Sequence, residues 1–480
     1  MEFNLQKPSI TPTIMTLLQF LRQARQVHLQ FLAGALIESP IYVLGNPSAD
    51  LDSIISAILY SYCANNRLPA TTSRPHVPLL NLSNVPAGPE LYRLRPEFVT
   101  ALWLSTNAPA LRPEEHFDNS PDSGNLLREH IVTIADFAQA MKELPTPKQL
   151  TVDATLVDWN ALPERTPGRE GQGSLGGALP GVLFRAVGCI DHHADEHFMP
   201  GVEALPTKQP LIIQLGPGSC SSLVTHEMQR RGFWSACADA SSAAEVAQVA
   251  KLGLAAMLID TSNLTAEGKV TEVDVQAVEL LRGRVTGATG NSESEWDIEA
   301  FYEQVLKAKQ NSLDLLTLEE VLDRDYKDWT ETMQSSGESV KLGFCSSVKP
   351  VRWIVRKAGG PRELLDGISS FAAKEDKKLD VVVVMTSFTS KVGEFSRELL
   401  VCATSDRQVA LDGINSFISK ATSQLQLVAV DGESVDMPED RIRSTLDGDA
   451  GLWSRLWSQK NTTASRKQVA PMLRTAVAKL

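Results

Sequence analysis

The stretch at residues 41–62, IYVLGNPSADLDSIISAILYSY, changes its hydrophobic pattern within a few positions. Residues 41–45 are a short apolar run typical of a buried strand, and after a polar turn residues 51–66 repeat apolar side chains at helical spacing. The turn brings Asp50 and Asp52 close together, and neighbouring carboxylates repel each other unless a cation lies between them or one is protonated. The stretch therefore predicts a strand–turn–helix unit of an α/β fold with a cation site at its turn.

Similar units follow along the chain. Apolar strands alternate with helices, and polar clusters recur where the predicted strands end, in residues 150–162, 181–196, 210–233 and 242–264. Such alternation favours a doubly wound, mainly parallel sheet, in which ligands bind beyond the carboxyl ends of the strands. The Gly- and Pro-rich residues 164–181 are predicted to be an exposed loop.

A chain of 480 residues is too long for one ordinary core, so we expect more than one domain. Composition changes near residues 284–297. We expect a helical extension at 1–35, an α/β domain at 36–300 and a smaller α/β or α+β domain at 301–480.

Composition excludes several classes of protein. The formal net charge of −12 disfavours general binding to nucleic acid or to anionic membranes. No run approaches the roughly 18 uninterrupted apolar residues that a transmembrane helix needs, and the N-terminus lacks the layout of a signal peptide. The six cysteines are scattered without C-x-x-C spacing, which favours reduced thiols and a cytoplasmic location.

Four segments place acidic or imidazole groups at the ends of predicted elements. These groups are Asp50 with Asp52, Asp158, Asp191 with His192 and His193, and Asp260. A single aspartate at such a place is usually a helix cap or a turn former. Four clusters in one α/β domain instead predict a mixed nitrogen and oxygen ligand set, which suits manganese(II), magnesium or cobalt(II) better than structural zinc.

The motifs G-N-x-x-x-D-x-D-S, V-D-x-N, D-H-H and D-T-x-N, in this order, resemble those of the DHH phosphoesterase superfamily. GSCSS at 218–222 resembles a further element of that superfamily, and DRDYKDW at 323–329 and SRKQ at 465–468 resemble its second type of associated C-terminal domain. The resemblance implies an active site in the cleft between the two domains. Asp153 lies on the same predicted strand as Asp158, but LVDWN matches the motif and LTVDA does not.

Within the superfamily the chain most resembles the fungal cytosolic exopolyphosphatases. Family-II inorganic pyrophosphatases are shorter and carry a histidine where this chain has Asn46, whereas prune-type proteins share the asparagine.

The resemblance implies two divalent ions, manganese(II) or magnesium, with cobalt(II) as a further candidate. They would generate a hydroxide nucleophile at neutral pH and bind the phosphoryl oxygens. One ion would be bound by Asp50 and Asp158 with Asn46 nearby, and the other by Asp52, Asp158, His192 and Asp260.

Further roles are carried over to matching positions. Asp191 would orient the histidines, and His193 would face the substrate phosphate as a hydrogen-bond donor or general acid. The catalytic group implied in this way is His193, Asp158 and Asp191. The implied contacts to a polyanionic substrate are His193, Lys327, Arg397, Arg466, Lys467 and Ser219.

These observations predict a monomeric, metal-dependent exopolyphosphatase that releases terminal orthophosphate from inorganic polyphosphate. A prune-like enzyme acting on short-chain polyphosphate or cyclic nucleotides is one alternative. A regulatory homologue that has lost activity is the other.

Overall fold

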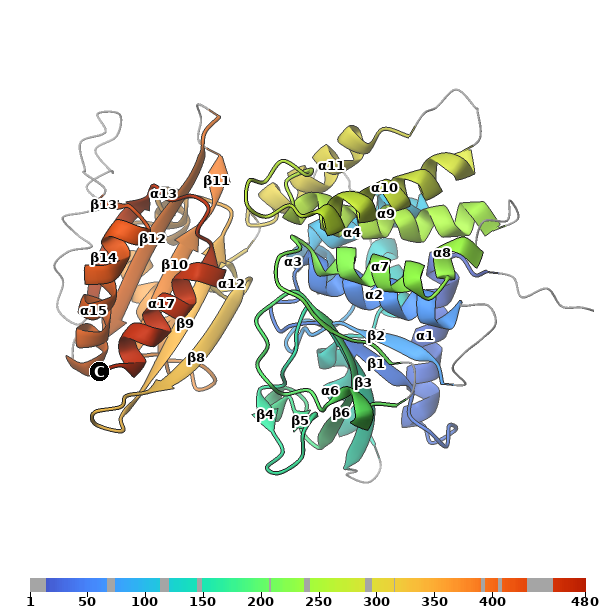
Figure 1. Cartoon of the computed structure of the whole chain (residues 1–480), viewed down its shortest axis with the longest axis horizontal. Helices are drawn as coiled ribbons and strands as arrows, with labels where there is room; N and C mark the ends of the chain where they lie inside the picture. The colour runs from blue at the N-terminus through green and yellow to red at the C-terminus, as the bar shows by residue number, and fades with distance from the viewer. Residues whose placement is uncertain are drawn as a thin grey trace, which may run out of the picture. The chain divides into compact units, whose positions relative to one another are not determined.

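The chain forms two compact units, Met1–Lys309 and Gln310–Leu480, each built around its own sheet (Figure 1). The computed structural model describes residues 14–66, 74–112, 121–144, 149–206, 209–236, 242–289, 296–314, 316–389, 393–404, 408–429 and 452–480. The boundary predicted after residue 300 lies within helix α11 (Ile298–Asn311).

The sheet of the first unit has the strand order β2-β1-β3-β6-β5-β4, and β7 pairs with β6. Its strands are β1 (Ile41–Leu44), β2 (His76–Leu79), β3 (Leu150–Val157), β4 (Glu164–Arg165), β5 (Gln172–Ser174), β6 (Val182–Asp191) and β7 (Leu211–Ile213). Strands β2, β1, β3, β6 and β7 are paired in parallel. The predicted mainly parallel sheet is confirmed, and the carboxyl ends of β1, β3 and β6 therefore lie at one edge.

The described helices of this unit pack around the sheet and on one another. They are α1 (Leu17–Leu32), α2 (Leu51–Asn65), α3 (Pro89–Leu94), α4 (Pro96–Thr106), α5 (Pro121–His130), α6 (Ile134–Lys142), α7 (Cys220–Arg230), α8 (Phe233–Ala236), α9 (Ala243–Asp260), α10 (Glu272–Thr289) and α11. Helix α2 is buried along almost its whole length and contacts β1, α7 and α9. Because α2 follows β1 after a short turn, the N-terminus of the helix lies at the carboxyl edge of the sheet.

The prediction for residues 164–181 was wrong in part, because this segment is not only loop. Strands β4 and β5 form an antiparallel hairpin, and β5 extends the sheet by pairing with β6. A Cβ atom at Gly173 would lie 2.3 Å from the carbonyl oxygen of Glu164. Only glycine allows this close approach. Because glycine has no apolar side chain, the hydrophobic pattern of the segment does not indicate a strand.

The second unit has a sheet of strand order β13-β14-β12-β10-β9-β8, with β11 paired to β12. Its elements are α12 (Leu318–Asp323), β8 (Tyr326–Thr332), β9 (Ser339–Ser347), α13 (Val351–Ala358), α14 (Pro361–Ala372), β10 (Val381–Thr386), β11 (Phe388–Thr389), β12 (Phe395–Thr404), α15 (Gln408–Gln424), β13 (Leu427–Ala429), β14 (Leu452–Gln459) and α17 (Arg466–Ala478). Only β9 and β10 are paired in parallel among these described strands.

Strand β10 explains how this second sheet is covered on both faces. Val381 and Val383 belong to the core that includes residues of α15 and α17, whereas Val382 and Val384 belong to the core that includes residues of α12, α13 and α14. Because successive side chains of a strand point to opposite faces, an unbroken valine run fits a strand buried on both sides.

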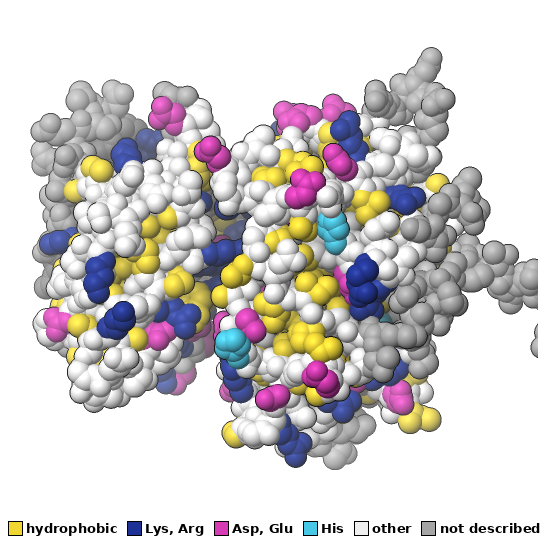
Figure 2. All heavy atoms as spheres, in the orientation of Figure 1, with side chains coloured by type: hydrophobic (Ala, Val, Ile, Leu, Met, Phe, Trp, Pro, Cys, Tyr) yellow, Lys and Arg dark blue, Asp and Glu magenta, His cyan; other side chains and the backbone are white. Residues whose placement is uncertain are grey.

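The predicted N-terminal amphipathic helix corresponds to α1, which begins with a capping box formed by Thr16 and Gln19. Residues 1–13 of that predicted extension lie outside the described residues. No helix in the described ranges is long and apolar enough to cross a membrane. Acidic and basic side chains are interspersed over the visible faces of both units (Figure 2).

Candidate metal centre

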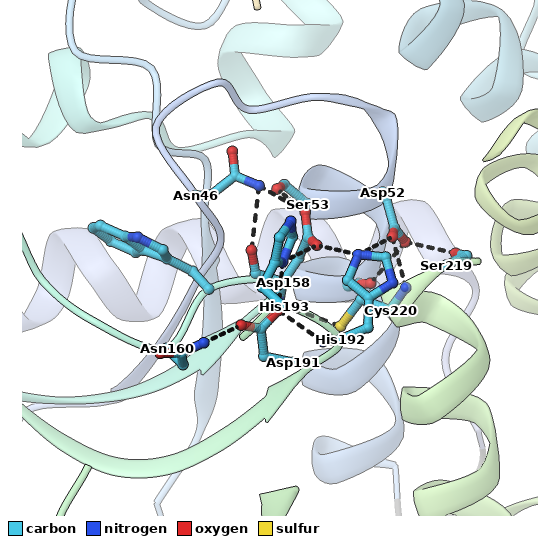
Figure 3. A network of polar contacts seen from close by, with 12 residues as sticks. Asn46, Asp52, Ser53, Asp158, Asn160, Asp191, His192, His193, Ser219 and Cys220 are labelled. Atoms are coloured by element: carbon cyan, nitrogen blue, oxygen red, sulfur yellow. Dashed lines mark hydrogen bonds and ion pairs between the residues drawn. The ribbon is translucent and has the colours of Figure 1, made fainter. Parts of the chain in front are cut away.

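Most of the predicted acidic and imidazole residues gather beyond the carboxyl ends of β1, β3 and β6 (Figure 3). Asp52 lies in the first turn of α2, Asp158 follows β3, and Asp191 ends β6 directly before His192 and His193. The parallel pairing of these strands brings together side chains that are more than a hundred residues apart in the sequence.

The turn after β1 approaches the start of α2 closely. A Cβ atom at Gly45 would lie 2.8 Å from the Cβ atom of Ser53, so only glycine fits without a shift. Asp50 caps α2, because its Oδ1 atom accepts a hydrogen bond from the backbone N–H of Ser53 at 3.0 Å. The amide of Asn46 donates to Asp158 Oδ2 at 2.7 Å. In this structure, then, Asp50 stabilises the helix and Asn46 orients Asp158.

Asp158 has a left-handed backbone with φ of 54°, which is costly for a residue with a side chain and typical of functional sites. Its backbone N–H is held by the carbonyl of Ile190 at 3.0 Å and by the Cys220 sulfur at 3.2 Å. Its Oδ2 atom accepts from Asn46 and from the Ser53 hydroxyl at 2.6 Å. Its Oδ1 atom is buried and has no hydrogen-bond partner among the described residues.

His192 points at this unsatisfied oxygen. Its Nδ1 atom lies 2.9 Å from the carbonyl oxygen of Pro217, and since a carbonyl only accepts, Nδ1 carries the proton. In the neutral ring Nε2 then has a lone pair, and this atom lies 3.0 Å from Asp158 Oδ1. Both groups are almost fully buried. Two electron pairs facing each other in a buried site are favourable only with a proton or a metal cation between them.

Asp52 completes the group on the other side. Its Oδ1 atom accepts from the Ser219 hydroxyl at 2.8 Å and from the backbone and hydroxyl of Ser221 at 3.0 and 2.8 Å. Its Oδ2 atom accepts from the backbone of Cys220 at 2.6 Å and lies 3.9 Å from His192 Nε2. Burial and the neighbouring charge of Asp158 raise the pKa of Asp52, whereas His192 opposes the rise.

These distances fit a divalent ion. Oxygen ligands at about 2.1 Å in octahedral geometry would lie about 3.0 Å apart when adjacent and about 4.2 Å apart when opposite. The distances from His192 Nε2 to Asp158 Oδ1 and to Asp52 Oδ2 fall within that range, at 3.0 and 3.9 Å. Ligand atoms of Asp158, His192 and His193 also lie within 4.8 Å of one another. The chain thus offers a preformed group of nitrogen and oxygen atoms that could hold a metal ion.

Asp191 is fully buried and holds both histidines. Its Oδ1 atom accepts from the backbone N–H of His192 and from His193 Nδ1, both at 2.8 Å, and its Oδ2 atom accepts from Asn160 at 2.6 Å. Burial raises the pKa of Asp191, and the charge of His192 and the bond from Asn160 oppose that rise. The side chain of His193 is 28% exposed.

Asp260, the last residue of α9, is electrostatically linked to the same group although it is not part of the three-residue cluster. Burial and the charges of Asp52, Asp50 and Asp158 raise the pKa of Asp260 well above its ordinary range, and Lys309 opposes them. The excess negative charge of these carboxylates is the physical reason to expect a cation.

Asp153, the rejected alternative to Asp158, lies elsewhere on β3. It is buried and accepts hydrogen bonds from Arg74 at 2.5 Å and from Arg185 at 2.6 Å. Burial alone would raise its pKa, but the two arginines outweigh burial and lower the pKa of Asp153. This aspartate therefore belongs to a structural ion cluster.

The second unit is similar to a known family. Residues 303–476 match the family model described as the DHHA2 domain. A protein of Schizosaccharomyces pombe described as "Putative exopolyphosphatase" is 28% identical over 439 residues, which cover 91% of this chain and 90% of that protein. These matches confirm the predicted resemblance to the DHH phosphoesterase superfamily.

A solved structure described as "Crystal structure of Methanococcus jannaschii putative family II inorganic pyrophosphatase" also aligns with this chain. The TM-score is 0.46 with 17% sequence identity, and the alignment covers 91% of this chain and 98% of that one. At this score the alignment adds nothing to the assignment.

The cations predicted to contact substrate lie in the segment that matches the DHHA2 family model. Arg466, at the start of α17, donates to the carbonyl and carboxylate of Asp325 at 2.8 and 2.7 Å, and to the Ser346 hydroxyl at 3.1 Å. Arg397 donates to the carbonyl of Thr462 at 2.7 Å, in the turn before α17, and burial lowers its pKa. Lys327 lies in β8 and Lys467 in α17.

Several residues that position the site were assigned no role in the sequence analysis, although Ser53, Asn160 and Cys220 lie inside the quoted motifs. Ser53 and Asn160 bind the carboxylates of Asp158 and Asp191, and Cys220 contacts the backbone of Asp158. Ser219, predicted to bind substrate, donates to Asp52 in this structure.

Proposed function

We propose that this protein is a metal-dependent hydrolase of phosphoanhydrides, and specifically an exopolyphosphatase that releases terminal orthophosphate from inorganic polyphosphate. The DHHA2 domain and the similarity to the exopolyphosphatase named above support the proposal. The decisive support is geometric, because His192 Nε2 and Asp158 Oδ1 are buried 3.0 Å apart, an arrangement that a divalent ion between them would stabilise.

Divalent ions bound at such a centre supply a hydroxide nucleophile at neutral pH and neutralise charge on phosphoryl oxygens. In our proposal Asp52, Asp158 and His192 bind one ion with Asp260 nearby, and Asp158 and Asp50 bind a second ion beside Asn46. Asn46 and Ser53 hold Oδ2 of Asp158, which leaves Oδ1 directed at His192.

His193 is the proposed general acid. Its Nδ1 atom donates to Asp191, which fixes the ring and leaves Nε2 to carry a proton to the leaving phosphate oxygen. Asp191 also accepts from the backbone of His192, so one carboxylate orients the proposed metal ligand and the proposed acid.

The proposed polyphosphate contacts are Lys327, Arg397, Arg466 and Lys467 of the DHHA2 domain. Guanidinium groups bind phosphate oxygens bidentately, and Asp325 keeps the guanidinium of Arg466 in a fixed orientation. A cytoplasmic location remains part of the proposal, because the five described cysteines are free and buried.

The test is phosphate release from long-chain polyphosphate, tripolyphosphate, pyrophosphate and cyclic AMP, each with manganese(II), magnesium or EDTA. Asp158→Asn is the inactive control, and Asp136→Asn is the matched control for loss of a carboxylate outside the site. We expect metal-dependent release from the long chain and little from pyrophosphate.

Other outcomes separate the alternatives. Hydrolysis of tripolyphosphate or cyclic AMP alone would replace the proposal with a prune-like activity. No hydrolysis of any of the four compounds, by protein that is folded and has bound manganese(II), would replace it with a regulatory role.

A further inference from the structure

Asp274, in the first turn of α10, lies outside every motif discussed above and is fully buried. Its Oδ2 atom accepts from the backbone and hydroxyl of Thr271 at 2.9 and 2.8 Å, and from the backbone of Gly218 at 2.9 Å. Its Oδ1 atom accepts from the Ser222 hydroxyl at 2.7 Å and from the backbone of Ser219 at 3.4 Å. One carboxylate thus ties the start of α10 to the segment that begins α7.

That segment supplies the groups that orient two of the proposed metal ligands. The carbonyl of Pro217 accepts from His192 Nδ1 and so fixes the ring tautomer. The Ser219 hydroxyl and the Cys220 backbone donate to the two carboxylate oxygens of Asp52. Figure 3 shows Ser219 and Cys220 beside Asp52, with His192 between Asp52 and Asp158.

The segment can be held only in a narrow range of positions. A Cβ atom at Gly218 would lie 2.7 Å from the carbonyl oxygen of Lys269 and 2.8 Å from a methyl carbon of Thr261. The backbone at Gly218 is therefore packed against the turn that precedes α10. Asp274 provides the hydrogen bond that holds it there.

We propose that Asp274 is a positioning residue of the metal centre, acting through residues 217–222 on His192 and Asp52. The proposal rests on the proposed function only in that it takes the centre to bind a divalent ion. If the carboxylate is changed to an amide, an NH2 group replaces an oxygen that now accepts from N–H or O–H donors. The segment then shifts, and both ligands lose the partners that fix their orientation.

The chain contains a matched control. Asp136 in α6 has the same T-x-x-D arrangement, because it accepts from the backbone and hydroxyl of Thr133, both at 3.0 Å. It also reaches a second segment, accepting from the backbone of Ala87 at 3.1 Å. Asp136→Asn therefore removes a similar cap and a similar link between segments, with no contact to the group that orients His192 and Asp52.

The experiment compares Asp274→Asn with Asp136→Asn in three measurements. These are the manganese(II) dissociation constant from the electron paramagnetic resonance signal of free ion, the Tm in EDTA, and the imidazole ¹⁵N shifts of His192 in metal-free protein. We expect both variants to lower the Tm. We expect only Asp274→Asn to weaken manganese(II) binding, by about 10- to 100-fold, and to change the tautomer of His192.

The proposal is overturned if Asp274→Asn lowers the Tm as Asp136→Asn does but leaves manganese(II) affinity within twofold of the wild type. If Asp274→Asn does not fold, the same measurements are made on Ser222→Ala, which removes one hydrogen-bond donor to Asp274. We then expect manganese(II) affinity to fall at least threefold. If the wild type binds no manganese(II), the proposed function fails. The tautomer of His192 then still tests Asp274, and an unchanged tautomer contradicts the inference.

Discussion

Two buried histidines of the first unit each contribute stability that is predicted to be lost as the pH falls below neutral. Burial, with Arg25 nearby, lowers the pKa of His28 from 6.5 to about 4. Burial, with Arg74 and Arg231 nearby, lowers the pKa of His76 to about 4. Both ring nitrogens of His76 are buried, and the backbone of Arg74, which favours the charged form, only partly opposes the lowering of the pKa.

The sign of the effect follows from proton binding. Below pH 6.5 the histidines of the unfolded chain take up protons, whereas those of the folded chain stay neutral until about pH 4. The stability that they contribute is therefore complete above pH 6.5 and is lost as the pH falls toward 4. The difference between 6.5 and about 4, at about 1.36 kcal/mol per pH unit, lowers the free energy of unfolding by about 3 kcal/mol for each histidine. This loss is large beside a typical total of about 5–15 kcal/mol.

The assay is urea denaturation followed by circular dichroism at several pH values between 7 and 4.5, in EDTA, for the wild type and His76→Met. The raised pKa values of Asp52, Asp191 and Asp260 act in the opposite direction, because those groups stabilise the fold at low pH and lose that contribution as the pH rises. Their contribution is common to both proteins, so the difference between the two curves isolates His76. We expect the slope for His76→Met to be smaller by about 1.4 kcal/mol per pH unit. Equal slopes would refute the reasoning.

Three further predictions concern single positions. Asp153→Asn weakens the ion pairs of Asp153 with two partly exposed arginines. It should lower the free energy of unfolding by about 1–3 kcal/mol in urea denaturation with unchanged manganese(II) affinity, and a loss below about 0.5 kcal/mol would contradict the structural role. Gly45→Ala places a methyl group 2.8 Å from the Cβ atom of Ser53. It should cost about 1–3 kcal/mol and weaken manganese(II) binding measured by calorimetry, and unchanged binding would count against it. His193→Gln should lower kcat on polyphosphate by about 10²–10⁴-fold with manganese(II) affinity nearly unchanged, whereas a normal kcat would exclude a general acid at this position.

The sequence predicted that the site residues lie close together, because they follow strands that were expected to pair in parallel. Asp158 and Asp191 come directly after apolar runs, and the carboxyl ends of neighbouring parallel strands meet at one edge. The choice of Asp158 over Asp153 rested on the match of LVDWN to the superfamily motif. The structure gives its physical reason, since Asp153 is neutralised by two arginines.

Other features depend on contacts that no local pattern reveals. The tautomer of His192 is set by the carbonyl of Pro217, a backbone atom 25 residues away in the chain. Asp274 carries the ordinary T-x-x-D signature of a helix cap, and only the fold places Gly218 against it. The hairpin of β4 and β5 was missed because glycines that permit close strand approach also remove the apolar alternation by which strands are found.

The account depends most directly on a divalent ion between Asp158 and His192. Anomalous diffraction at the manganese absorption edge, from crystals grown with manganese(II), would locate it. The account predicts a peak about 2.1 Å from both Asp158 Oδ1 and His192 Nε2, and no peak there in crystals of Asp158→Asn. Fully ordered side chains with no anomalous peak at this position, at millimolar manganese(II), would show that only a proton joins the two groups and would contradict the central claim.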